Sequence, residues 1–199
     1  MPNIFTNSRF LISAHKVQQL PPDNGQEIAF AGRSNAGKST TINALTNHRG
    51  LAKVSKTPGR TQLLNCFEFA PGQRLVDLPG YGYAKVPEKM RKHWQQEINR
   101  YLLGRQSLIG IVLIMDIRHP MKEFDQQMLA WAHQSEMKVH LLLNKADKLS
   151  SSQVRSTLEQ VKKTVAEVTP NASVQTFSAL RKTGAKELSA VLQSWFKTV

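Results

Sequence analysis

Residues 32–39 read Gly-Arg-Ser-Asn-Ala-Gly-Lys-Ser, which has the spacing G-x-x-x-x-G-K-[ST] of a phosphate-binding loop. The glycines allow a tight turn, so that successive backbone N–H groups point at phosphate oxygens from the start of a helix. Lys38 is expected to reach the β- and γ-phosphates of a nucleotide, and the Ser39 hydroxyl to bind Mg²⁺. The residues predicted to contact the nucleotide here are Gly32, Arg33, Ser34, Asn35, Ala36, Gly37, Lys38, Ser39 and Thr40.

A second motif, Asp-Leu-Pro-Gly, occupies residues 77–80. An aspartate at the end of a strand can hold Mg²⁺ through a water, and a glycine N–H at the fourth position can meet a γ-phosphate. By itself the motif is commonly just a turn, and its position downstream of residues 32–39 favours the functional interpretation. We therefore predict Asp77 as a metal-site residue beside Ser39, and Gly80 as a nucleotide contact.

Between these motifs lies a predicted switch loop, residues 57–61, with the sequence Thr-Pro-Gly-Arg-Thr. Thr61 can complete the magnesium shell only while a γ-phosphate is present, which gives it a metal-binding and a catalytic role. Thr57 is a weaker candidate for that role, and the alternative interpretation of Thr61 is an ordinary residue at a strand edge. Gly59 and Arg60 are expected beside the nucleotide, although Arg60 suits a contact to RNA or to the loop itself better than a built-in arginine finger.

The base-recognition signal is Asn144-Lys145-Ala146-Asp147, which follows an apolar strand pattern. A carboxylate at Asp147 can accept hydrogen bonds from the guanine N1–H and exocyclic amine, a donor pair that adenine lacks. Asn144 is expected to tie this loop to residues 32–39, and the Lys145 stem to lie over the base. Backbone N–H groups of residues 178–180, namely Ser178, Ala179 and Leu180, are expected near the guanine oxygen.

The elements that must position these motifs alternate along the chain. Apolar runs predict strands at residues 27–31, 63–69, 74–78, 109–115, 139–143 and 173–177. Helical spacing predicts helices at residues 38–46, 88–103, 121–135, 151–168 and 183–196. A turn signal at residues 70–73 makes the second and third strands an antiparallel hairpin. The prediction is one α/β domain of three layers, α/β/α, with a mostly parallel mixed sheet and sites at the carboxyl ends of its strands.

Composition favours one compact domain with a polyanionic partner. The chain has 199 residues and a net charge of +13, and residues 28–67 contain no acidic side chain. Such a balance suggests nucleic acid, with simple solubility as the alternative interpretation. A second basic run includes Lys89 and Lys92. The single cysteine, Cys66, excludes an internal disulfide and is interpreted as a small buried hydrophobe in a cytoplasmic protein. No apolar run approaches membrane-spanning length, so no membrane association is expected.

Taken together, the motifs resemble those of translation-factor-related P-loop GTPases with a Ras-like G domain, and among them those of the EngB family. The most specific segments are residues 32–39, 56–62, 77–84 and 115–120. The resemblance implies a G domain at residues 26–199 preceded by an extension, residues 1–25, whose role the sequence leaves open. It also implies GTP hydrolysis, a role in assembling the large ribosomal subunit or its precursor through contact with ribosomal RNA, and a requirement in cell division and septation.

Two features bear on hydrolysis. Tyr81 occupies the position where many GTPases have a water-orienting glutamine, so intrinsic turnover is expected to be slow without a partner. Similar GTPases with asparagine at the position of Asn35 use it to hold K⁺ near the phosphates; the alternative is that Asn35 only supports its loop. Asp116 is interpreted as structural, paired with Arg118 or a loop backbone, rather than as a catalytic carboxylate.

The motifs allow two alternatives to a GTP-hydrolysing enzyme. An ATP-using enzyme such as a kinase is disfavoured by residues 144–147. An RNA-binding regulatory module that binds GTP or GDP with little turnover is kept open by Tyr81. No heptad pattern calls for a dimer, so a monomer is expected.

Overall fold

A mixed β-sheet forms the centre of the protein in the computed structural model, which describes residues 2–53, 63–81, 88–170 and 172–196, with side chains from residue 95 onward in the third range. The strands of this described part are β1 (Arg9–Ala14), β2 (Gln26–Gly32), β3 (Leu64–Ala70), β4 (Gln73–Asp77), β5 (Leu108–Asp116), β6 (Lys138–Asn144) and β7 (Ser173–Thr176). Their order in the sheet is β1-β3-β4-β2-β5-β6-β7. Pairs among β4, β2, β5, β6 and β7 are parallel, whereas β3 is antiparallel to both β1 and β4.

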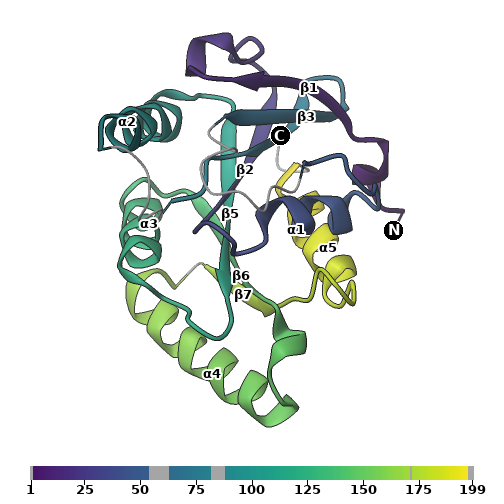
Figure 1. Cartoon of the computed structure of the whole chain (residues 1–199), viewed down its shortest axis with the longest axis vertical. Coiled ribbons are helices and arrows are strands. Elements are labelled where there is room, and N and C mark those ends of the chain that lie inside the picture. The colour runs from purple at the N-terminus through teal and green to yellow at the C-terminus, as the bar shows by residue number, and fades with distance from the viewer. Residues whose placement is uncertain (1, 54–62, 82–87, 171, 197–199) are drawn as a thin grey trace.

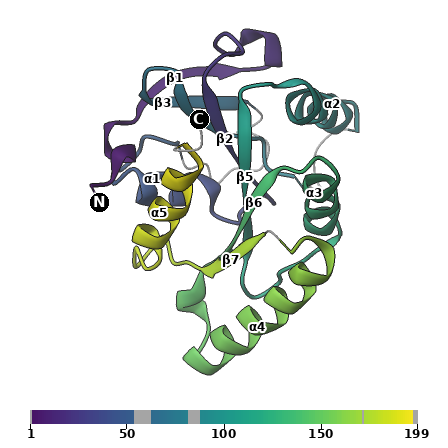
Figure 2. The same ribbon diagram turned by 180° about the vertical axis from the view of Figure 1, so that it is seen from behind.

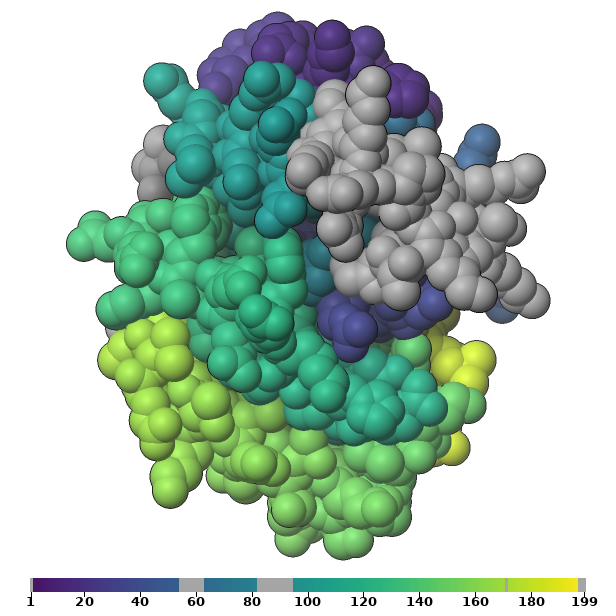
Figure 3. Space-filling model, turned by 60° about the vertical axis from the view of Figure 1, so that its left-hand side comes forward, coloured from purple at the N-terminus to yellow at the C-terminus, as the bar shows by residue number. Residues whose placement is uncertain are grey.

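Helices cover both faces of this sheet (Figures 1 and 2). The α-helices are α1 (Lys38–Leu45), α2 (Glu88–Gly104), α3 (Glu123–Gln134), α4 (Ser151–Val168) and α5 (Ala185–Phe196). Side chains of α2, α3 and α4 enter one hydrophobic core and those of α1 and α5 the other. Strand β5 supplies both cores because its side chains alternate, with Leu113 on one side and Val112 and Ile114 on the other. Figure 3 shows the α2, α3 and α4 face in space-filling form.

The three-layer α/β architecture and the hairpin are therefore confirmed. Each predicted strand and helix is present, with ends shifted by no more than two residues. The sequence missed β1, which pairs with β3 at the edge of the sheet. Three of the six residues of β1 are exposed, including Phe10 at 51%, and only Ala14 among the six is buried, so the sequence of β1 carries little of the apolar alternation that marks a half-buried strand. The same N-terminal segment contributes the fully buried Phe5, whose ring packs edge-on against Phe69.

A buried ion cluster joins β2 and β4 to the end of α2. Glu27 is fully buried, and Arg105 donates to both of its carboxylate oxygens at 2.7 and 3.0 Å. Arg74 Nε lies 3.0 Å from Glu27 Oε1, and the Tyr101 hydroxyl donates to Oε2 at 3.0 Å. Arg105 also donates to the Pro21 carbonyl at 2.7 Å. The cluster thus fixes the segment before β2 and the end of α2 to the amino end of the sheet.

His140, on β6, makes the stability of the fold depend on pH. Its ring is buried, and its nitrogens lie 2.7 Å from Ser173 Oγ and 3.0 Å from Gln175 Oε1. Burial lowers the pKa of His140 to about 4, against the opposing effect of the Gln175 hydrogen bond. Since the unfolded chain takes up this proton near pH 6.5, stability is full above that pH and is lost as the pH falls toward 4.

We expect the free energy of unfolding to fall by about 2 kcal/mol between pH 7.5 and pH 5 on account of this one residue. Urea unfolding at the two pH values measures the change. The variant His140→Asn cannot be protonated in this range, so its stability should change less with pH than that of the wild type. Equal changes in the two proteins would contradict the assignment.

Within the described ranges, none of the helices combines the length and the apolar character that crossing a bilayer requires.

Candidate functional site

The predicted motifs meet at the carboxyl edge of the sheet. Residues 32–39 connect β2 to α1, residues 77–80 follow β4, and residues 144–147 and 178–180 follow β6 and β7. Strand β2 lies between β4 and β5. After β2 the chain first forms the strands on one side of it, β3 and β4, and then crosses to β5 on its other side. Open α/β sheets bind ligands at such a point, because the loops on either side leave a crevice between them.

Backbone conformation explains why a glycine opens α1. Gly37 caps the helix with φ +100°, and a Cβ at this position would lie 2.2 Å from Asn144 Nδ2. The space is taken because Asn144 Nδ2 donates a 2.8 Å hydrogen bond to the Ala36 carbonyl. Asn144 therefore ties the loop after β6 to the loop before α1, as the sequence predicted.

Lys38 and Asp77 form the charged centre of the phosphate side. Lys38 Nζ lies 3.5 Å from the Gly32 carbonyl oxygen. Burial lowers the pKa of Lys38, and the negative charge of Asp77 opposes this shift. Burial likewise raises the pKa of Asp77, opposed by Lys38 and by a hydrogen bond from Ser39. In each residue, burial disfavours the charged form and the charge of the other residue favours it.

The donor set beside Asp77 fits a magnesium ion. The Ser39 hydroxyl donates to Asp77 Oδ2 at 3.3 Å, while the buried Asp77 Oδ1 has no hydrogen-bond partner among the described residues. An unpartnered buried carboxylate oxygen is costly unless a cation or a water binds it. Hydroxyl and carboxylate oxygens are ligands that Mg²⁺ prefers, and it commonly takes its remaining ligands from water and phosphate. The described side chains contain no cluster of three or more His, Cys, Asp or Glu that could hold a metal ion.

Residues 80 and 81 lie directly on the phosphate loop. A Cβ at Gly80 would come 3.0 Å from Lys38 Nζ and 3.2 Å from Ser34 N, so a larger residue would require these neighbours to shift by a few tenths of an ångström. The Ser34 N–H donates to the Tyr81 carbonyl at 2.8 Å. The Tyr81 ring stacks on Phe124 at 4.2 Å, and its hydroxyl donates to Asp125 on α3. Tyr81 is therefore held on α3, and its hydroxyl is already committed.

The base side is organised around Asp147. Its Oδ1 accepts a 2.5 Å hydrogen bond from the Ser178 hydroxyl, which holds the pKa of Asp147 below its usual value. Asn144 Oδ1 accepts from the Lys145 N–H at 2.8 Å and from the Ala179 N–H at 3.3 Å. The segments after β6 and β7 are therefore held together, with a charged carboxylate between them.

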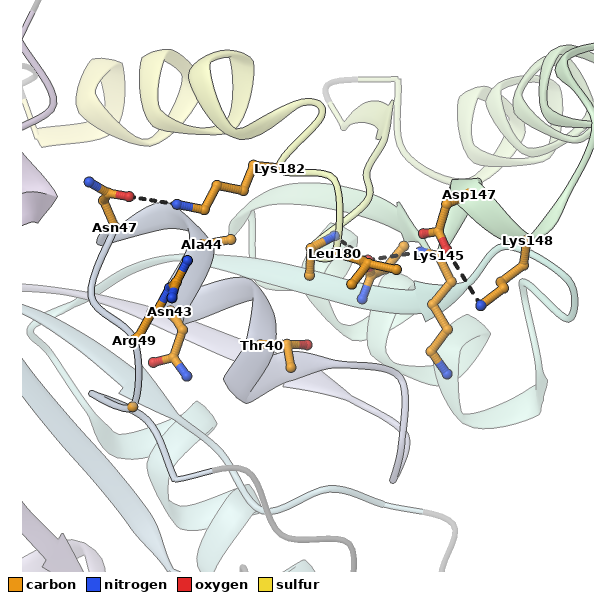
Figure 4. A pocket seen from close by; sticks show the side chains of 13 residues that line it. Thr40, Asn43, Ala44, Asn47, Arg49, Lys145, Asp147, Lys148, Leu180 and Lys182 are labelled. Carbon is orange, nitrogen blue, oxygen red and sulfur yellow. Dashed lines mark hydrogen bonds and ion pairs between the residues drawn. The ribbon is translucent and has the colours of Figure 1, made fainter.

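A cavity of about 490 Å³ opens beside Asp147 (Figure 4). Some of the residues that line it were predicted from the sequence. Others come from the end of α1 and the loop that follows it, namely Asn43, Asn47, Arg49 and Gly50, and Lys182 comes from the loop before α5. The Lys182 ammonium donates to Asn47 Oδ1 at 2.7 Å between these two segments. The sequence missed these residues because they form no spaced motif. The exposed side chain of Leu180 lies at the same opening.

Lys145 links the base side to the phosphate loop. Its ammonium donates to the Asn35 carbonyl at 2.6 Å and to Asp116 Oδ2 at 2.9 Å. Arg118 also pairs with Asp116, which confirms the structural interpretation of that carboxylate. The contact between Asp116 and Lys145 was not foreseen. That the Lys145 stem covers a base stays a prediction.

Several predicted residues lie outside the part of the chain that the structure describes. These are Thr57, Gly59, Arg60 and Thr61, together with the side chains of Lys89 and Lys92. Cys66, by contrast, is fully buried, and burial raises the pKa of its thiol to about 12. Its interpretation as an inert core residue is confirmed.

Comparisons with known proteins agree with this geometry. Residues 27–145 match the family model described as a 50S ribosome-binding GTPase. The chain is 55% identical over 195 residues to a probable GTP-binding protein EngB of Pasteurella multocida, covering 98% of this chain and 95% of that protein. It is 53% identical over 192 residues to the Escherichia coli protein of the same description, covering 96% and 91%.

Solved structures show the same fold. A crystal structure of a probable GTP-binding protein EngB superposes with a TM-score of 0.69 at 21% identity, covering 87% of this chain and all of that one. The elongation factor SelB of Methanococcus maripaludis gives 0.62 at 14% identity, covering 88% and 34%. The family match and the two high-identity relatives establish that this chain is a member of the EngB family of P-loop GTPases and hydrolyses GTP.

Proposed function

We propose that GTP or GDP binds across the carboxyl ends of β2, β4, β6 and β7, with Mg²⁺ beside Ser39, Thr61 and Asp77. The main supporting observation is that two acidic sites lie on loops that contact each other. Asp77 pairs with Ser39 of the phosphate loop, and Asp147 pairs with Ser178 on the base side. The hydrogen bond from Asn144 to the Ala36 carbonyl connects the phosphate loop to the base-side loop. One ligand with phosphates at one end and a guanine at the other suits this pair of sites. The proposed contacts are residues 32–40, Gly59, Arg60, Thr61, Asp77, Gly80, Asn144, Lys145, Asp147, Ser178, Ala179 and Leu180.

Hydrolysis transfers the γ-phosphoryl group to water, and the protein contributes position and positive charge. Lys38 would neutralise charge on the β- and γ-phosphate oxygens, and the N–H groups before α1 would hold the same oxygens. Mg²⁺, when held beside Ser39 and Asp77, would supply further positive charge to the phosphates. A Cβ built on Gly80 would lie 3.0 Å from Lys38 Nζ, so the Gly80 backbone is near the proposed position of the γ-phosphate.

Intrinsic turnover should be slow, because Tyr81 does not supply a water-orienting amide. Its hydroxyl donates a hydrogen bond to Asp125, and its ring stacks on Phe124. We infer that a ribosomal partner accelerates hydrolysis. The same observation favours, as a second candidate, a regulatory RNA-binding module that binds GTP or GDP and barely hydrolyses it. Single-turnover kinetics with and without purified large-subunit particles separates the two.

The proposed partner is the large ribosomal subunit or its precursor, contacted in the cytoplasm by a monomer through ribosomal RNA. Support comes from the net charge of +13, from an acid-free stretch at residues 28–67, and from the ribosome-binding description of the matching family. Because the acid-free stretch contains the phosphate loop, bound nucleotide is expected to control docking. The proposed cellular role is assembly of that subunit, with a consequent requirement in cell division and septation.

Co-sedimentation with large ribosomal subunits tests this role. We expect tighter binding with a GTP analogue than with GDP or without nucleotide, and a strong loss of binding as salt rises, since RNA phosphate contacts release counterions. Binding that ignores nucleotide, or that is absent at moderate salt, would remove the ribosomal role and leave GTP hydrolysis standing. The variants Lys89→Glu and Lys92→Glu test whether the second basic run takes part.

A potassium ion is the proposed activator next to Asn35. This residue has φ +63° and an exposed side chain at the phosphate loop, and its carbonyl is already bonded to Lys145. A cation held by the amide oxygen would add the charge that an arginine finger supplies in other GTPases. Turnover should then be higher in K⁺ than in Na⁺ buffer at equal ionic strength. Equal rates in both, with and without ribosomal particles, would leave Asn35 only a supporting role.

A further inference from the structure

The segment at residues 115–120 has no part in the roles assigned so far, although the sequence singles it out. It ends β5, beside β6 in parallel register, so that Asp116 stands opposite Asn144. The Ile117 N–H donates to the Asn144 carbonyl at 2.9 Å. The segment is therefore fixed at the point where the base-side loop begins.

Asp116 is held in one orientation by Arg118. The guanidinium makes a bidentate contact, donating from Nε to Oδ1 at 2.9 Å and from Nη2 to Oδ2 at 2.6 Å. The Arg118 backbone N–H adds a third bond to Oδ1 at 3.1 Å. Burial disfavours the charged carboxylate, but the hydrogen bonds from Arg118 and Lys145 outweigh it and hold the pKa of Asp116 below its usual range. Asp116 is thus a fixed negative charge near neutral pH.

That charge is directed at Lys145. The Lys145 ammonium lies between Asp116 Oδ2, at 2.9 Å, and the Asn35 carbonyl, at 2.6 Å. Lys145 and Asn35 both have left-handed backbone conformations, with φ near +65° and +63°, which side chains other than glycine adopt at some cost. The Lys145 ammonium therefore links the base-side loop to the phosphate loop, and the Asp116 carboxylate compensates its positive charge.

We propose that Asp116, oriented by Arg118, is a positioning residue for nucleotide binding, which holds the Lys145 stem where the guanine lies and couples the base-side loop to the phosphate loop. This inference rests on the proposed nucleotide site. Asp116 itself does not line the 490 Å³ cavity beside Asp147, so it acts through Lys145. Its loss should speed the release of GDP and of a GTP analogue alike, because Lys145 lies on the base side.

The variant Asp116→Asn keeps the shape of the side chain and removes its charge. We expect fluorescent GDP and a fluorescent GTP analogue to dissociate roughly tenfold faster from it than from the wild type. The single-turnover rate of hydrolysis at saturating GTP should change less than the release rates, since the hydrogen bonds of Lys38, Ser39 and Asp77 do not involve Asp116. Glu123→Gln is the matched control, because Glu123 is an exposed carboxylate in the first turn of α3, and its release rates should equal those of the wild type.

A double-mutant cycle distinguishes positioning from a general structural role. In a Lys145→Ala background, Asp116→Asn should accelerate release no further, because the group through which it acts is gone. An equal acceleration in both backgrounds, or unchanged release from the single variant, would overturn the proposal. If the single variant does not fold, as judged by thermal unfolding without nucleotide, Arg118→Gln tests the same link and should speed release about threefold. A wild type that fails to bind fluorescent GDP would overturn the nucleotide site itself.

Discussion

Replacing Asp147 with asparagine should weaken the binding of GDP and GTP by about 10³-fold or more. The Asp147 carboxylate is charged, and one of its oxygens is oriented by the Ser178 hydroxyl at 2.5 Å. It can accept from both the N1–H and the exocyclic amine of guanine. An asparagine has one acceptor and presents its NH₂ to the guanine amine, so that two donors face each other and remain unsatisfied.

Equilibrium titration with fluorescent GDP measures this loss, and xanthosine diphosphate provides the control for a folded site. Xanthine has a carbonyl where guanine has the amine, so the asparagine NH₂ gains an acceptor. The Asp147→Asn variant should therefore bind the xanthine nucleotide better than GDP, reversing the preference of the wild type. An equal loss for both nucleotides would indicate a collapsed loop and contradict direct base recognition by Asp147.

The second large effect is expected at Glu27, far from the nucleotide site. Glu27 and Arg105 have side chains 0% and 5% exposed, and Arg74 is 3% exposed beside them. Removing the negative charge leaves the buried Arg74 guanidinium with no other carboxylate partner among the described residues and Arg105 with only Asp23, 3.4 Å away. Breaking buried pairs in this way commonly costs about 3–5 kcal/mol. For Glu27→Gln we expect a loss of about 3 kcal/mol or more in the free energy of unfolding, which lowers Tm by about 10 °C in a chain of this size.

Chemical and thermal unfolding measure this loss, and Glu68→Gln is the matched control. Glu68 makes the same kind of ion pair, with Arg9 at 2.6 Å, but the Arg9 side chain is 73% exposed. Exposed pairs contribute little, so the control should lose less than about 1 kcal/mol. A similar small loss in both variants would mean that water or neighbouring carbonyls compensate Arg74 and Arg105 without Glu27.

Tertiary structure was needed for the contacts that link the motifs. The pairing of Asp116 with Lys145 joins residues 29 positions apart, and that of Lys182 with Asn47 joins residues 135 apart. Neither pair has a spacing that can be recognised. The first depends on the sheet order that places the end of β5 beside the end of β6, and the second on the loop before α5 lying beside the loop after α1. The position of the Tyr81 hydroxyl on Asp125 likewise depends on where α3 packs.

The sequence by itself determined the phosphate loop, the base-side motif and the alternation of strands and helices. Those features are local: Gly37 is required by a backbone with φ +100°, and the 2.0 and 3.6 periodicities follow from which face of an element is buried. The structure alone revealed the edge strand β1, whose exposure removes that periodicity, and the ion cluster around Glu27, assembled from residues distant in the chain. Local backbone geometry restricts which residue types are allowed, and so leaves a pattern in the sequence. A contact between distant elements restricts only how they pack, which a single sequence does not record.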